Sequence, residues 1–147
     1  MGISKEIIQA CENTLPTFAF SISFVSETRE MTLNSSEEVN ILIGLSNGLQ
    51  GNVVISFSRK AALKIISAMM GGMEVGEIDN IGESALGEMV NILMGSAIAL
   101  LPDNIIELSP PTIVQGSDIY LMISNIAAQK MEFKIDEESF FIRYAIQ

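Results

Sequence analysis

The chain has 147 residues, of which 48% are apolar and 18% are charged. About 100 to 200 residues is usual for one domain, and this composition disfavours disorder. We therefore expect one globular domain over residues 1–147. Its 8 basic and 18 acidic side chains leave a formal charge of −10. This charge repels nucleic acid phosphates and anionic membrane surfaces, so neither is an expected partner.

Histidine is absent and cysteine occurs once, at Cys11. The lack of an imidazole excludes serine and cysteine hydrolase triads and histidine-dependent zinc sites. A single cysteine forms no internal disulfide and no CxxC pair, which favours a reducing, cytoplasmic setting. The N-terminus lacks the apolar run of a secretory signal. Polar and glycine residues interrupt the longest charge-free stretch, residues 39–58, so we expect paired strands there and no membrane span.

The first half of the sequence predicts one helix followed by strands. Ser4 is the expected cap of a helix that Pro16 ends near Leu15. Apolar and polar residues then alternate with the period of a strand. The strands predicted in this way cover residues 18–24, 39–45 and 52–57. Asn47-Gly48 supplies the positive φ angles of a tight hairpin between the last two.

The second half contains two helices and a further set of strands. A short amphipathic helix follows Ser58 and ends at Gly71-Gly72. A longer helix starts near Asn80 and continues to Leu101, where Pro102-Asp103 breaks it. The apolar segments after this break cover residues 105–108, 112–114, 119–123, 128–135 and 140–146. Most of these segments are predicted strands, and residues 136–138 form a turn between the last two.

A helix followed by strands therefore occurs twice, from Ser4 and again from Asn80, with the shorter helix between the two units. This order suggests an internal duplication. The expected fold class is α+β, with helices packed on a largely antiparallel sheet.

The helix over residues 81–101 has two different faces when its residues are placed at about 100° intervals. The predicted core face carries Leu86, Met89, Val90, Leu93, Ala97 and Leu100. The opposite edge, a stripe of roughly 60°, carries Ser84, Glu88, Asn91 and Gly95. This edge has one charge and has Ile92 and Met94 on its flanks, whereas a solvated helix face normally carries several charges. We expect another molecule to cover it.

The polar pair Glu88 and Asn91 allows two interpretations. An amphipathic helix must present something polar, so ordinary surface is the simpler one from spacing alone. The chemical alternative is that the Asn amide holds a water in one orientation while the carboxylate anchors a cation of a partner. Neither side chain is a nucleophile suited to covalent catalysis. Such a pair can position water on a reactive bond that belongs to another protein.

The segment Ser84 to Gly95, read as S-x(3)-E-x(2)-N-x(3)-G, resembles the signature helix of the CheC/CheX/FliY phosphatases of bacterial chemotaxis. Residues 87–95 (GEMVNILMG) and 108–116 (LSPPTIVQG) are particularly similar to the CheX branch. CheC-type members carry the pair in both repeats, whereas the N-terminal helix here offers only Glu6-x-x-Gln9 and Glu12-Asn13. One site per chain is the CheX pattern.

The resemblance implies a phosphatase that acts on the aspartyl phosphate of a CheY-like response-regulator receiver domain. Glu88 would pair with the receiver's active-site lysine, and Asn91 would orient the attacking water for in-line displacement. Ser84, Gly95 and Met94 would contact the receiver. This chain would need no cofactor or metal of its own, because the receiver would supply the Mg²⁺.

The resemblance also implies a homodimer. Strands near both ends of the chain leave sheet edges that a second copy can extend. Two other functions stay open at this point. One is a non-catalytic interaction module, similar to flagellar-switch relatives, and the other is a small-molecule binding domain, for which the sequence shows no convergent polar cluster.

Overall fold

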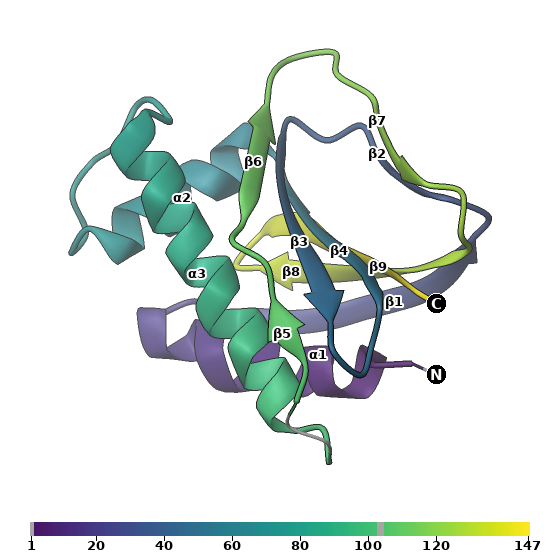
Figure 1. The fold of residues 1–147 in the computed structure, drawn as a ribbon. Coiled ribbons are helices and arrows are strands. Elements are labelled where there is room, and N and C mark those ends of the chain that lie inside the picture. The colour runs from purple at the N-terminus through teal and green to yellow at the C-terminus, as the bar shows by residue number, and fades with distance from the viewer. Residues whose placement is uncertain (1, 103–104) are drawn as a thin grey trace.

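An antiparallel sheet carries the three α-helices on one of its faces (Figure 1). The computed structural model describes residues 2–102 and 105–147. Its helices are α1 (Ser4–Thr14), the 3₁₀ helix η1 (Leu15–Phe18), α2 (Arg59–Met69) and α3 (Asn80–Ala99). Its strands are β1 (Ile22–Glu30), β2 (Leu33–Ser35), β3 (Val39–Ser46), β4 (Gly51–Phe57), β5 (Glu107–Leu108), β6 (Thr112–Gln115), β7 (Leu121–Ser124), β8 (Ala128–Ile135) and β9 (Glu138–Ile146). The predicted α+β class is confirmed.

The strand order has an internal two-fold symmetry. Within the described residues, seven strands form one sheet in the order β1-β8-β9-β4-β3, with β5 and β6 both paired to β3, while β2 and β7 form a separate ribbon. Exchanging β1 with β6, β2 with β7, β3 with β8 and β4 with β9 gives the same order, read from the opposite edge of the sheet. The helices α1 and α3, which precede these two sets of strands, pack against each other. The topology supports the predicted duplication.

Most of the local predictions agree with the structure. The hairpin between β3 and β4 turns at Asn47 and Gly48, whose φ angles are 59° and 113°. The Ser58 hydroxyl caps α2 by accepting a hydrogen bond from the Ala61 N–H at 3.1 Å. Gly71 and Gly72, with φ angles of 74° and 89°, follow its end as predicted. The predicted break at Pro102-Asp103 lies partly outside the described residues, and α3 ends at Ala99.

Two predictions in the first unit are wrong. Residues 18–24 do not form one strand, because Pro16 lies in the first turn of the short helix η1, which extends to Phe18, and Ala19 turns the chain with a φ angle of 65°. The strand β1 starts only at Ile22. Ser4 is not the helix cap, since the helix starts at that residue and its hydroxyl instead contacts Glu27 and Tyr144.

The core lies between the helices and the sheet. A row of phenylalanine rings crosses four neighbouring strands on the face of the sheet that the helices cover. Their centroids are 5.5 Å apart for Phe24 and Phe133, 5.2 Å for Phe133 and Phe140, and 5.3 Å for Phe140 and Phe57. Such pairs add to the free energy gained from burial. Cys11 is fully buried, as predicted, and burial raises the pKa of its thiol.

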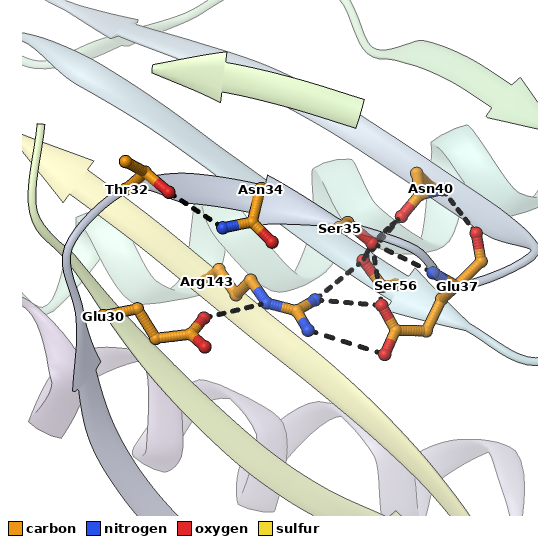
Figure 2. Close-up of polar contacts among 8 residues, drawn as sticks. All are labelled: Glu30, Thr32, Asn34, Ser35, Glu37, Asn40, Ser56 and Arg143. Atoms are coloured by element: carbon orange, nitrogen blue, oxygen red, sulfur yellow. Dashed lines mark hydrogen bonds and ion pairs between the residues drawn. The ribbon is translucent and has the colours of Figure 1, made fainter. Parts of the chain in front are cut away.

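The opposite face of the sheet contains a buried polar cluster that the sequence did not reveal (Figure 2). Arg143 on β9 is only 4% exposed. Its guanidinium lies 3.2 Å from a Glu37 carboxylate oxygen and 3.6 Å from one of Glu30. The Asn40 side-chain oxygen accepts hydrogen bonds from the Ser35 and Ser56 hydroxyls at 2.5 and 2.7 Å. The cluster joins β9, β4 and β3 to β2, to the end of β1 and to the loop between β2 and β3.

The cluster makes stability depend on pH through Glu37. Burial alone would raise the pKa of Glu37, but the Ser35 hydroxyl and the Arg143 guanidinium outweigh it and lower that pKa. A carboxyl whose folded-state pKa is depressed stabilises the fold above its unfolded-state pKa of about 4.3, and this contribution is lost as the pH falls through the folded-state value.

We therefore predict that Glu37→Gln lowers the free energy of unfolding at pH 7, and that the difference from the natural chain shrinks below about pH 4.3. Urea unfolding at a series of pH values measures both. The control is Glu107→Gln, which changes an exposed carboxylate on β5, outside the cluster. The prediction is contradicted if Glu37→Gln lowers the free energy of unfolding by the same amount at pH 3 as at pH 7.

Candidate functional site

The helix α3 presents the predicted pair to solvent from a well-fixed backbone. The Asp79 side chain caps the helix by accepting a hydrogen bond from the Gly82 N–H at 2.8 Å. The apolar residues that anchor α3 in the core are Leu86, Met89, Val90, Leu93, Met94, Ala97 and Ile98. Glu88 and Asn91 lie one turn apart on the outer side, and both are exposed. Their backbone is therefore held by packing while their side chains are free to meet a partner.

Most of the predicted edge is where the sequence placed it. Ser84 and Gly95 are exposed on the same side of α3 as Glu88 and Asn91. Ile92, predicted as an apolar flank, is 38% exposed. The structure therefore brings the four residues of the edge onto one open surface.

Two assignments on this helix are wrong. Met94 is fully buried, so it cannot contact a receiver. It lies two turns after Gly87, on the flank of α3 that faces the edge of the sheet, and the sequence periodicity did not show that this flank is covered. Leu100, predicted in the core, is 48% exposed, because α3 ends at Ala99 and Leu101 turns into the core instead.

A groove of about 540 Å³ runs beside the pair, between α3 and the start of β6. We call it the α3–β6 groove. It is lined by Asn80, Glu83, Ser84, Gly87, Glu88, Asn91, Pro111 and Ile113. The helix supplies all of its polar residues, and the segment at the sheet edge supplies two apolar ones. The groove connects Glu88 and Asn91 to the first turn of the helix.

The width of the groove is set by close contact between Gly87 and Pro111. A Cβ atom on Gly87 would lie 3.1 Å from the Pro111 Cγ, so only glycine allows this approach without displacement. The segment before Pro111 is itself fixed to β3. Ser109 accepts a hydrogen bond from the Gly44 N–H through its hydroxyl, at 2.7 Å, and donates its own N–H to the Gly44 carbonyl at 2.9 Å.

The far end of the groove holds an oriented carboxylate. The Gln115 side-chain amide donates to Glu83 at 2.9 Å and to the Ile78 carbonyl at 3.2 Å. Glu83, Gln115 and Pro111 were not predicted from the sequence as residues of the site. Residues 108–116 were noted only as a motif, and nothing in the sequence indicated that they fold back against α3.

The equivalent helix of the first unit carries no second pair. Its buried residues Ile7, Ala10, Cys11 and Thr14 have the same spacing as Leu86, Met89, Val90 and Leu93 of α3. Superposing these two buried stripes places Gln9 at the position of Glu88 and Glu12 at the position of Asn91. An amide and a carboxylate are both present there, but in the reverse order. Of these two helices, α3 alone therefore carries Glu and Asn in the predicted order.

The site contains a carboxylate and an amide without a strong nucleophile beside them. Within residues 2–102 and 105–147, no group of three or more Cys, Asp or Glu side chains could hold a metal ion. No helix of this part of the chain is long and apolar enough to cross a membrane. The arrangement can bind a cation and orient a water molecule, but the reacting bond must come from elsewhere.

Comparison with known proteins places this fold among chemotaxis proteins. Over its full length the chain is similar to the crystal structure of the chemotaxis protein CheX from Desulfovibrio desulfuricans, with a TM-score of 0.88, 18% identity and coverage of 100% of both chains. A structure of the CheX–CheY–BeF₃–Mg²⁺ complex from Borrelia burgdorferi matches with a TM-score of 0.79 and 17% identity, covering 99% of this chain and 98% of that one. These likenesses show the fold.

The sequence identifies the family. Residues 39–136 match the profile of the family described as chemotaxis phosphatase CheX. The CheY-P phosphatase CheX of Thermotoga maritima is 32% identical over 109 residues, which are 72% of this chain and 70% of that protein. The chain belongs to the CheX family of chemotaxis phosphatases, which confirms the resemblance drawn from its motifs.

Two glycines of α3 give a matched test of this geometry. Gly87→Ala should lower the free energy of unfolding, because its methyl group meets the stiff ring of Pro111. Gly95→Ala should raise it by about 0.5 to 1 kcal/mol, because alanine is the better helix former. Nothing described lies within 4 Å of a Cβ atom at Gly95. Urea unfolding measures the free energy of unfolding of both variants. Equal changes in the two variants would contradict the close contact between Gly87 and Pro111.

Proposed function

We propose that this chain removes the phosphoryl group from the aspartyl phosphate of a CheY-like receiver domain, using Glu88 and Asn91. The family and the CheY-P phosphatase activity of the Thermotoga relative support this function. The observation that carries the assignment of residues is that both side chains are exposed on a rigid helix, beside a groove, without a nucleophile of their own. The buried, reduced thiol of Cys11 fits a cytoplasmic location.

In the proposed reaction the two proteins share the active site. The Glu88 carboxylate pairs with the lysine of the receiver's phosphorylation site, which holds α3 against the phosphoryl group. The Asn91 amide accepts from and donates to one water molecule and aligns it for in-line attack on phosphorus. The bond from phosphorus to the aspartyl oxygen then breaks, and inorganic phosphate leaves. The receiver's Mg²⁺ stabilises the charge that develops on the phosphoryl oxygens.

Ser84 and Gly95 extend this contact along the helix. Glycine inside a helix costs about 1 kcal/mol relative to alanine. At Gly95 the fold gives no reason for this cost, because the residue is exposed and a Cβ atom would meet no described atom within 4 Å. The reason we propose is close approach of the receiver one turn after Asn91. The Gly95→Ala variant should accordingly dephosphorylate more slowly although it is more stable.

Removal of Asn91 tests the catalytic assignment. Asn91→Ala should slow hydrolysis of the phosphorylated receiver by about 100-fold, because the attacking water loses its orientation. Glu88→Ala should lower kcat/KM by about 10- to 100-fold, because a charge-assisted contact is lost. Loss of phosphate from a CheY receiver, followed with and without each variant, measures both.

Folding is the control for these two variants. Both side chains lie outside the core, so the free energy of unfolding should change by less than about 0.5 kcal/mol. Full activity of Asn91→Ala would remove this residue from the mechanism. A natural chain that binds the receiver without accelerating phosphate loss would instead support the non-catalytic interaction module.

We also propose that two copies associate through β1. This nine-residue strand is largely exposed, and within the described residues β8 is its one sheet neighbour. The other sheet edge, next to the groove, is interrupted by Pro110 and Pro111, which lack N–H groups and are poorly suited to sheet extension. Pairing through β1 would leave both Glu88/Asn91 sites open.

Sedimentation at physiological salt tests the dimer. We expect twice the mass of the chain at micromolar concentration, and we expect Ser26→Pro on β1 to shift the mass toward the monomer because proline removes an N–H group from this edge strand. The matched substitution Ser117→Pro, in the exposed loop after β6, should leave the dimer intact. A natural chain that sediments as a monomer rejects the proposal.

A further inference from the structure

We propose that the α3–β6 groove receives a second basic side chain of the receiver, a lysine or arginine other than the one that pairs with Glu88. This inference rests on the proposed function, because it assumes that the receiver covers the outer face of α3. It assigns Glu83 as a docking residue that raises affinity for the receiver without taking part in the hydrolysis.

The two walls of the groove match the two parts of such a side chain. Pro111 and Ile113 form an apolar wall on the sheet side, while α3 supplies the polar wall. Lysine and arginine carry a long aliphatic stem and a charged head, and they bury the stem against apolar surface while the head finds polar partners. A purely apolar side chain would leave the polar wall without partners.

The Glu83 carboxylate is positioned to receive the charged head. The Gln115 amide donates to one of its oxygens at 2.9 Å, which holds the side chain at the groove. Gln115 is itself fixed by its second contact with the Ile78 carbonyl. A carboxylate has about four lone-pair positions, so acceptor capacity is left for a partner. An oriented carboxylate loses less side-chain entropy when it binds than a mobile one.

The charges of the groove select a cation. Its lining contains Glu83 and Glu88 and, among the residues that the structure describes there, neither lysine nor arginine. The whole chain carries a formal charge of −10. An acidic side chain of a partner would therefore be repelled both locally and over long range, whereas a basic one would be attracted.

Glu83 lies too far along α3 from Asn91 to take part in the hydrolysis. It lies five residues before Glu88 and eight before Asn91, which is about 7.5 and 12 Å along the helix axis. A head group bound at Glu83 is therefore more than a turn of helix away from the water that Asn91 orients. Loss of this contact should change the KM for the receiver and leave kcat unchanged.

Glu83→Gln is the sharpest variant, because it removes only the charge. The remaining carbonyl oxygen still accepts the hydrogen bond from Gln115, so the fold and the wall of the groove are kept. The control is Glu77→Gln, which removes the same charge from an exposed residue of the loop before α3 that does not line the groove. Both variants have the same net charge, so long-range attraction of the receiver changes equally.

The probe is a CheY receiver phosphorylated in the presence of Mg²⁺, and phosphate loss is measured against receiver concentration. At low salt, Glu83→Gln should raise KM roughly 3- to 10-fold relative to Glu77→Gln with kcat unchanged. The difference should shrink at about 1 M salt, because salt screens the pair. Titration with CheY carrying BeF₃ and Mg²⁺ should show the same loss of affinity without turnover.

Equal KM values for the two variants at low salt overturn the inference. So does a fall in kcat at unchanged KM, since Glu83 would then act in the reaction and not in docking. These results leave the proposed function standing as long as Asn91→Ala is inactive. If the natural chain does not accelerate phosphate loss from the receiver at all, the proposed function fails and the inference fails with it.

Discussion

The close approach of α3 to the sheet edge is the constraint on which the site depends. Gly87 lies one residue before Glu88, and a Cβ atom at this position would lie only 3.1 Å from the Pro111 Cγ. Ser109 fixes this proline segment by its two hydrogen bonds to Gly44 of β3. The turn of α3 that carries Glu88 is therefore positioned by the sheet, through the contact between the small residue Gly87 and the stiff ring of Pro111. Precise placement of this kind is what a water-orienting side chain needs.

The sequence predicted the helix and its exposed pair because both follow from local rules. Apolar residues of α3 recur with the helical period, so the face that carries Glu88 and Asn91 could be placed before any contact was known. The groove could not be predicted, because it is formed by residues that are distant in the sequence. Pro111 meets Gly87, and Gln115 meets Glu83, only after the second set of strands has paired with the first.

The wrong assignments have the same physical origin. Periodicity shows which residues share a face, but it does not show how wide the covered surface is. Met94 lies on a flank that the sheet edge covers, so it is buried. Phe18 and Phe20 alternate like strand residues, yet Pro16 and the positive φ angle of Ala19 dominate the local backbone. The burial of Arg143 could not be predicted from the sequence, because its two carboxylate partners come from the far end of β1 and the loop before β3.

In the proposed function the open face of α3 supplies only part of an active site, and this has a consequence for signalling. On the proposed mechanism the metal, the lysine and the reacting bond all arrive with the receiver, so small phosphate esters of the cell are not substrates. The lifetime of the phosphorylated signal is then set by how often the two proteins meet. A cell can adjust that lifetime through the amount of this protein that it makes, and the domain needs no allosteric switch of its own.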